Sequence, residues 1–177
     1  MARKFARLYV NIWSDPDFVA LHTDEQVVYL GLISSADISW CGVNPLLPQR
    51  FAGLAANLTE HKARRAFATL QETRFVIVDT DTAEIAARTF IRHDEVMRQP
   101  NIAKAMGRAL GLVRSDRIRE AILDELGREF ATDPGLRGWA SLQAAYPDIY
   151  DKAVAKASGN PSRKGSRKPS DNPNGKG

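Results

Sequence analysis

Basic side chains gather at helical spacing in one stretch of this sequence. Arg64 and Arg65 are adjacent, and His61 and Lys62 stand three positions before them. Lysine and arginine side chains pair with phosphate groups, and arginine also forms paired hydrogen bonds with the edge of guanine. This cluster therefore offers the chemistry of binding an anionic polymer, in which no covalent bond is made or broken.

One helix over residues 59–74 would position the cluster. Thr59 stands where an N-cap belongs, because its hydroxyl can accept a hydrogen bond from a free backbone N–H of the first turn. Apolar residues recur at intervals of three and four: Ala63, Ala66, Phe67 and Leu70. Since these are expected to face the core, His61, Arg64 and Arg65 are turned outward and Lys62 flanks them.

A shorter helix is expected before it, from Pro48 to about Asn57, because Phe51 and Leu54 follow a proline that suits a first helical turn. Two helices joined by a short turn are typical of a helix-turn-helix, whose second helix enters the major groove of DNA. Arg50 would then contact a phosphate. The alternative is a helix pair with an ordinary solvated face.

The sequence period then changes from helical to extended. Residues 75–78 and 85–91 predict two strands, and residues 79–83 predict the turn of a hairpin. This order is that of a winged helix-turn-helix. The hairpin end carries carboxylates and no lysine or arginine: Asp79, Asp81 and Glu84. Because these groups would repel phosphates, the hairpin is expected to pack structurally and not to insert into DNA.

A third core helix and a first strand are expected upstream. Thr23 and Gln26 predict a capping box before a helix that is apolar nearly all round, and residues 39–47 suit a short strand. An aromatic arm precedes them. Its Trp13 is expected in the core, with stacking on a base as the alternative.

Further helices are expected after the hairpin. Apolar spacing predicts helices over residues 102–113 and 118–130, with a break near Ser115, and a weaker helix over residues 135–146 that Pro147 ends. Three basic residues lie off the apolar stripe and either extend a DNA-binding surface or form a solvated face: Arg98, Lys104 and Arg108.

The chain end predicts a disordered basic tail over residues 157–177, because residues 158–177 contain no apolar side chain that could be buried. Its basic units would add salt-sensitive affinity for nucleic acid: Arg163, Lys164, Arg167 and Lys168. A solubilising chain end is the alternative. The expected domains are a winged helix-turn-helix with its arm over 1–93, a helical extension over 94–156, and this tail.

Positive charge is concentrated around the predicted helix pair. The net charge is +4, and residues 50–119 hold 13 Lys or Arg against 8 Asp or Glu. Residues 1–49 and 120–156 are each net negative. The charge distribution is therefore the electrostatic footprint expected of a DNA-binding protein.

An enzyme is not expected. His22, His61 and His93 have no metal-ligand spacing, and no glycine-rich phosphate loop occurs, so neither a metal nor a cofactor is predicted. The single cysteine, Cys41, is expected to be a small, partly buried thiol. No apolar run approaches the length of a membrane span and no signal peptide is recognisable, so a cytoplasmic protein without membrane contact is expected.

Several segments carry a resemblance: "VYLGLISSAD", "RRAFATLQETRFV", "RTFIRHDEVMRQPNIAKAM" and the basic tail. Together they resemble small winged helix-turn-helix DNA-binding proteins of actinobacteriophages. They are also similar to the N-terminal domains of phage replication initiators and replisome organisers. The resemblance covers residues 5 to 110 and implies a mainly α fold with a small β-hairpin, in the α+β class, with a DNA-reading helix at 59–74. Its candidate DNA-binding residues are Thr59, His61, Lys62, Arg64 and Arg65.

The resemblance also implies a function. It is that of a phage-encoded protein of the bacterial host cytoplasm that binds double-stranded DNA in replication initiation or transcriptional regulation. Replication or transcription proteins of the host or phage would be further partners, and a homodimer is an option because such proteins often read two half-sites. The alternative is a winged-helix protein–protein interaction module without specific DNA readout.

Overall fold

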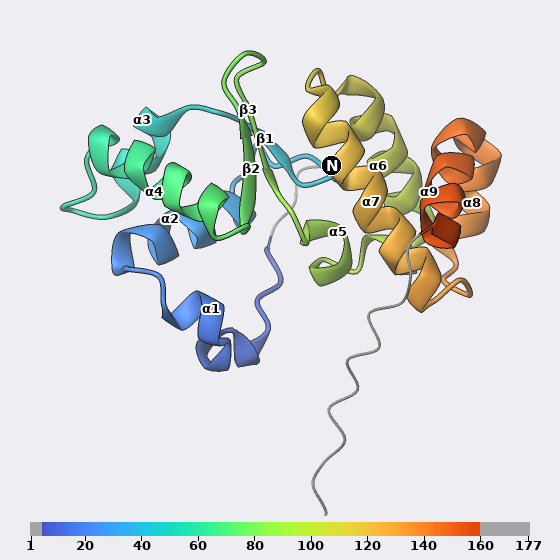
Figure 1. Ribbon diagram of the computed structural model, residues 1–177, viewed down its shortest axis with the longest axis horizontal. Coiled ribbons are helices and arrows are strands. Elements are labelled where there is room, and N and C mark those ends of the chain that lie inside the picture. Colours follow the sequence, from blue (N-terminus) through green and yellow to red (C-terminus); the bar gives the residue numbers. More distant parts are fainter. Residues whose placement is uncertain (1–4, 160–177) are drawn as a thin grey trace, which may run out of the picture.

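The computed structural model describes residues 5–159, which fold into helices around one small sheet (Figure 1). The first part contains η1 (Val10–Ser14), α1 (Pro16–Val19), α2 (Thr23–Ile33), β1 (Val43–Pro45), α3 (Pro48–Phe51), η2 (Ala52–Leu54), α4 (Glu60–Glu72), β2 (Val76–Asp79), β3 (Glu84–Ala87) and α5 (Phe90–His93). The second part contains η3 (Val96–Arg98), α6 (Pro100–Leu112), α7 (Asp116–Thr132), α8 (Gly138–Ala145) and α9 (Pro147–Gly159). The predicted α+β class is confirmed.

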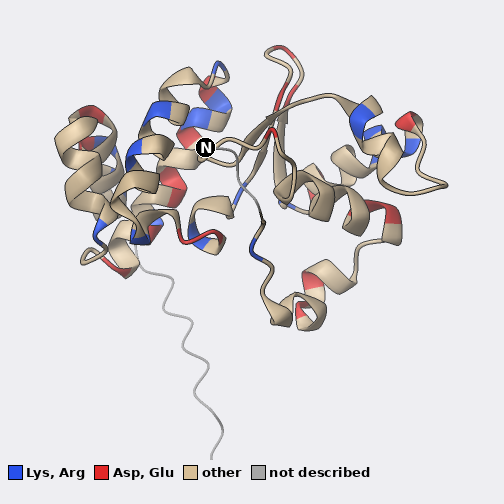
Figure 2. Cartoon of the chain, turned by 180° about the vertical axis from the view of Figure 1, so that it is seen from behind, with Lys and Arg blue, Asp and Glu red and all other residues tan. Residues whose placement is uncertain are grey.

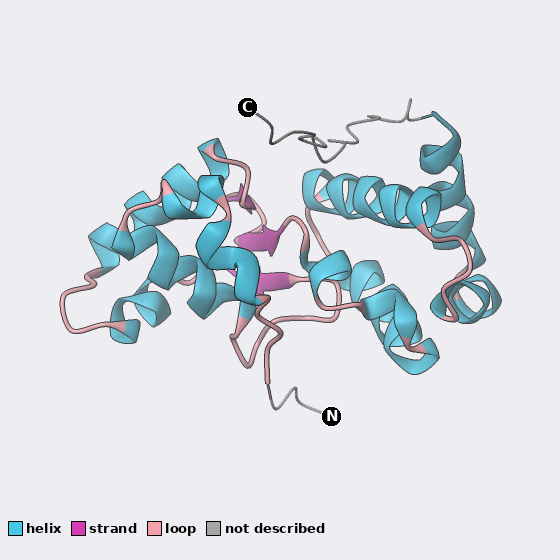
Figure 3. Cartoon of the chain, turned by 90° about the horizontal axis from the view of Figure 1, so that it is seen from below, coloured by secondary structure: helices cyan, strands magenta, loops and turns pink. Residues whose placement is uncertain are grey.

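The sheet lies between two groups of helices. Helices α1 to α4 lie on one side of the strands and α6 to α9 on the other (Figure 1), and the view from below keeps the strands between the same two groups (Figure 3). Because helices cover both sides of the sheet, every residue of β3 is buried. The sheet therefore joins the two groups into one body instead of lying at an edge.

Helix α4 forms as its apolar spacing predicts. Ala63, Ala66, Phe67 and Leu70 are at most 3% exposed. Phe67 packs edge-on against Phe51 of α3 with ring centroids 5.0 Å apart. The opposite face of α4 is consequently left to solvent.

The helix predicted over residues 48–57 is shorter than expected. It consists of one turn of α3 continued by the 3₁₀ helix η2, which ends at Leu54. Gly53 lies inside it, and glycine weakens a helix interior. The capping box also differs by one position, because His22 is the N-cap of α2 and its N–H donates to Glu25 at 2.5 Å.

The three strands are antiparallel in the order β1-β3-β2. Val43 pairs with Ala86, and Val78 pairs with Ile85, so the first strand lies in the predicted segment. The second hairpin strand was expected to run to residue 91 but ends at Ala87. Its last pairs are Ala86 with Val43 and Ala87 with Val76, the first residues of β1 and β2, and beyond them the chain turns into α5.

Gly42 allows this turn to pack closely. Its φ of +82° lies in the left-handed region, and a Cβ at this position would stand 2.6 Å from Cβ of Phe90. Only glycine adopts this backbone without strain and also leaves the room. Gly42 thus allows α5 to pack closely against the start of β1.

The C-terminal helices differ from the prediction at the end of the chain. Helices α6, α7 and α8 lie close to the predicted ranges, but Pro147 begins α9 instead of only ending α8. A proline suits the first turn of a helix because its missing N–H is not needed there. Residues 157–159, assigned to the tail from sequence, belong to α9; the rest of the predicted tail lies outside the described residues.

The predicted core position of Trp13 is wrong. Its side chain is 58% exposed and makes an edge contact with the core residue Phe18, at a centroid distance of 5.6 Å. The reason is local, since η1 buries none of its residues. Within residues 5–159, no helix has both the length and the apolar character that crossing a membrane requires.

Candidate nucleic-acid interface

The outward face of α4 carries the basic residues that the sequence singles out. The Thr59 hydroxyl caps the helix by accepting from the backbone N–H of Lys62 at 3.3 Å, as predicted. His61, Arg64 and Arg65 are exposed, and Lys62 is half-buried. The first two turns of α4 therefore present cations and an imidazole to solvent next to the positive end of the helix dipole.

The cations of this face differ in how much they are engaged inside the molecule. Lys62 pairs with Asp24 of α2 at 3.3 Å and so ties the start of α4 to the helix behind it. Arg64 pairs with Glu60 one turn earlier at 2.6 Å. Among the described residues, Arg65 makes no ion pair. Arg65 is thus the cation of this face most available to an external partner.

Arg50 lies on α3, close to α4. Its guanidinium bonds the carboxylate of Asp37, and both side chains are more than half exposed. Exposed ion pairs of this kind contribute little to stability and are exchanged readily for another anion. Arg50 can therefore still turn to a phosphate.

The remaining predicted basic residues lie elsewhere. Arg98 is in η3 and pairs with Glu95 at 3.4 Å, whereas Lys104 and Arg108 are exposed on α6 without an ion pair among residues 5–159. The sheet stands between α6 and α4 (Figure 1). The structure therefore does not bring all predicted residues into one patch. The basic residues predicted in the tail, from Arg163 to Lys168, lie outside the described part of the chain.

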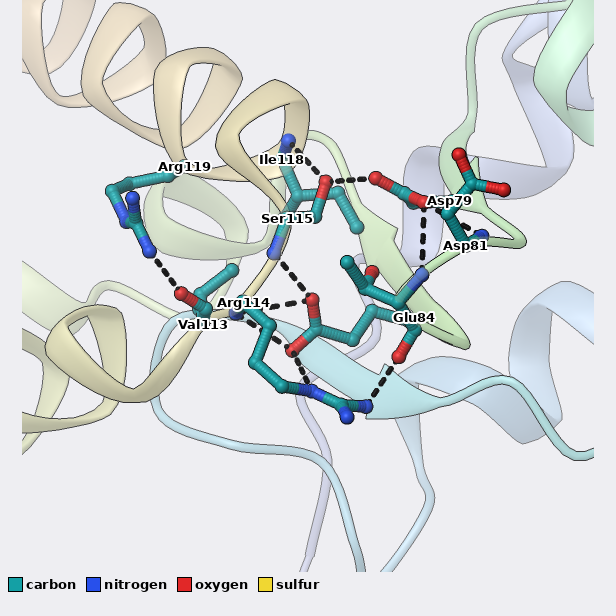
Figure 4. A network of polar contacts seen from close by, with 9 residues as sticks. Asp79, Asp81, Glu84, Val113, Arg114, Ser115, Ile118 and Arg119 are labelled. Carbon is teal, nitrogen blue, oxygen red and sulfur yellow. Dashed lines mark hydrogen bonds and ion pairs between the residues drawn. The ribbon is translucent and has the colours of Figure 1, made fainter.

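Two of the three carboxylates of the hairpin end, Asp79 and Glu84, are hydrogen-bonded inside the molecule (Figure 4). Glu84 is 8% exposed and accepts from the backbone N–H of Ser115 at 2.7 Å and from that of Arg114 at 3.1 Å. Asp79 accepts from the hydroxyl of Ser115, whose oxygen in turn accepts from the N–H of Ile118 at 3.1 Å. The hairpin is consequently fastened to the first turn of α7.

These contacts favour the charged form of Asp79. The hydrogen bond from Ser115 and then that from the backbone of Thr82 hold the pKa of this carboxyl below its ordinary value. The expectation that the hairpin packs structurally is confirmed by these contacts. The further expectation that the hairpin does not insert into DNA stays a prediction.

Sequence reasoning missed two residues at this place, Arg114 and Arg117. The guanidinium of Arg114 donates to the carbonyl of Thr82, and Nη1 of Arg117 donates to the carbonyl of Val78 at 3.4 Å. No local pattern points to them, because their partners lie more than thirty positions earlier in the chain. In the sequence, only the surplus of basic residues between positions 50 and 119 points to a basic surface that includes them.

A cavity of about 390 Å³ lies between the N-terminal arm, α2 and α5. Phe18, Tyr29 and Phe75 line it, and Tyr29 and Phe75 pack edge-on at 5.1 Å. Burial raises the pKa of Tyr29 and lowers that of His93, so both groups favour their neutral forms at neutral pH. Charged side chains line the cavity as well, among them Arg7, Asp15 and Arg74, so its wall is partly apolar and partly charged.

The described residues contain no cluster suited to a metal ion. Within 5–159, no three His, Cys, Asp or Glu side chains lie where they could hold a metal ion together. Cys41 is 1% exposed, and burial raises the pKa of its thiol to about 11. It is a core thiol, buried more completely than the partly buried thiol that the sequence predicts.

Known proteins add no further constraint. No protein-family model, curated protein or solved structure matches this chain significantly.

Proposed function

We propose that this chain binds double-stranded DNA as a winged helix-turn-helix protein. In this proposal α3 and α4 are the two motif helices, α4 enters the major groove, and β2 and β3 form the wing. One observation carries it: a capped amphipathic helix follows a short helix, precedes an antiparallel hairpin, and exposes basic residues on its first two turns. Helix-turn-helix proteins use the first turns of the second helix to contact bases.

The residues of α4 have different roles in the proposal. Arg65 and His61, which have no ion pair among residues 5–159, are the candidates for reading base edges. Arg64 reaches a phosphate or a guanine after releasing Glu60, and the release costs little because the pair is exposed. Lys62 and Thr59 hold the helix in place through Asp24 and the cap.

The proposed biological setting rests on the resemblance described above. It is a phage-encoded protein in the cytoplasm of a bacterial host, acting in replication initiation or transcriptional regulation. Selection of bound sites from a random duplex pool tests the readout. A palindromic result indicates a homodimer, because a two-fold protein reads two equivalent half-sites.

A double variant, Arg64→Ala with Arg65→Ala, tests the proposal. Each arginine that reads a base contributes about 1 to 3 kcal/mol, so the variant is expected to bind a selected duplex at least tenfold more weakly. The matched control is Arg137→Ala with Lys152→Ala, which removes two exposed charges, one at the N-cap of α8 and one on α9, that have no ion pair among residues 5–159. Unchanged affinity of the α4 variant at low and high salt would contradict the proposal.

A second candidate function is that of a protein-interaction module. The exposed apolar arm favours it, since Phe5 is 76%, Val10 91% and Trp13 58% exposed. Large apolar side chains grouped at the surface are typical of protein contacts. This candidate predicts that the wild-type chain shows no shift with random duplex DNA, whereas the first predicts a shift that disappears with added salt.

A further inference from the structure

Two arginines from the α6–α7 junction lie on the hairpin. Arg114 bonds the carbonyl of Thr82 and Arg117 that of Val78, and both side chains stay exposed, Arg114 at 68%. A guanidinium has five N–H donors. These contacts, together with the ion pair of Arg114 with Glu84, orient each group along the hairpin and leave further donors for a ligand.

Glu84 offsets part of the charge of Arg114, because Nε of Arg114 lies 4.0 Å from Oε1 of Glu84, but the nearby acids are engaged by other donors as well. Asp79 and Glu84 accept hydrogen bonds from Ser115 and Arg114, as Figure 4 shows. Asp116, at the first position of α7, pairs with Arg119 at 2.6 Å. Asp81, in the hairpin turn, is exposed, and its carboxylate makes no hydrogen bond among the described residues.

Helix α6 extends the basic surface. Lys104, Arg108 and Leu112 recur at intervals of four and are exposed, and α6 contains no acidic residue. Leu112 lines a groove of about 230 Å³ together with Glu84 and Arg114, so this stripe leads to the hairpin. Figure 2 shows blue segments on the helices beside the red hairpin end.

We propose that Lys104, Arg108, Arg114 and Arg117 form one surface, here named the junction surface, that holds the phosphate backbone of double-stranded DNA beside the hairpin. The helices after the hairpin thereby supply the cations that the hairpin itself lacks. The proposal rests on the DNA-binding function proposed above. It names phosphates as the partner because the four residues of the junction surface are exposed cations, and arginine and lysine side chains make many of the phosphate contacts in protein–DNA complexes.

A salt titration of duplex binding tests the junction surface. Arg114→Ala with Arg117→Ala removes two phosphate contacts and is expected to lower the slope of log affinity against log salt by about two. Its affinity should fall by a similar factor for selected and random duplexes, because phosphates carry no sequence information. Arg114→Lys with Arg117→Lys keeps the charges and should retain most of the slope.

The outcomes separate this inference from the proposed function. If Arg64→Ala with Arg65→Ala weakens binding while the junction variant keeps the wild-type slope, the junction surface is refuted and the function stands. If the wild-type chain binds no duplex at all, both are refuted. The Arg137→Ala, Lys152→Ala control should keep the wild-type slope, and thermal unfolding by circular dichroism shows that each variant is folded.

Discussion

Carboxylates that would repel a phosphate are turned into the molecule at the hairpin end. Asp79 uses its charge to accept from Ser115 and from the backbone, and Glu84 uses its charge to hold two backbone N–H groups. Charge-assisted hydrogen bonds of this kind are stronger than neutral ones. Two of the three hairpin acids are therefore engaged inside the molecule, and Asp81 is the one left exposed.

Asp79→Asn is expected to reduce stability in a pH-dependent way. Because hydrogen bonds hold the folded-state pKa below the unfolded one, the stabilisation is full above the unfolded pKa and is lost as the pH falls through the folded pKa. The free energy of unfolding of the variant should thus lie below that of the parent at pH 7, and the gap should narrow below about pH 4.

Urea unfolding at neutral and acidic pH measures this gap. Asp81→Asn is the matched control, because Asp81 lies on the same turn and its carboxylate makes no hydrogen bond among the described residues. A gap for Asp79→Asn that is equally large at both pH values would show that the carboxylate charge is not the cause.

Helix α4 depends on its cap at the scale of the element. Thr59→Ala removes the hydroxyl that accepts from the N–H of Lys62 and is expected to lower the free energy of unfolding by about 1 kcal/mol. Thr59→Ser keeps the hydroxyl and should stay close to the parent in chemical denaturation. Equal loss in both variants would instead assign the effect to the lost methyl group.

Local patterns account for the elements that sequence predicts correctly. Thr59 and the spacing of Ala63, Phe67 and Leu70 act within a few residues, so α4 could be placed closely. Pro147 shows the limit of such patterns, because the same residue that ends α8 also suits the first turn of α9. Trp13 shows a second limit of such patterns, because its residue type favours burial but the 3₁₀ helix that carries it lies on the surface.

The candidate site was predictable only in part for the same reason. The face of α4 follows from one helical period, whereas the junction surface depends on contacts between residues about thirty positions apart, such as Glu84 with Ser115. Such contacts arise only when the hairpin and the later helices have docked. Composition showed a basic region there but not its geometry.

At the scale of the whole molecule, Glu84 joins the sheet to the C-terminal helices. Glu84→Ala leaves the N–H groups of Arg114 and Ser115 without their acceptor, and Ser115 is 1% exposed. An unsatisfied buried donor costs about 1 to 3 kcal/mol, so a loss of about 2 kcal/mol in the free energy of unfolding is expected. Urea denaturation measures it.

Glu72→Ala is the control for this substitution, because Glu72 is exposed and makes no ion pair among residues 5–159. It should leave the unfolding midpoint nearly unchanged. A Glu84→Ala protein as stable as this control would mean that water replaces the carboxylate at no cost.

The bond between Glu84 and the start of α7 also gives the protein an internal reporter. The amide hydrogens of Arg114 and Ser115 precede the helix, so helical bonding does not protect them, and their carboxylate acceptor belongs to the hairpin. Their exchange with solvent deuterium therefore follows the separation of hairpin and helix and not the fraying of α7. Two amide signals thus follow, on a scale of minutes to hours, how often the halves of the molecule part while each remains folded.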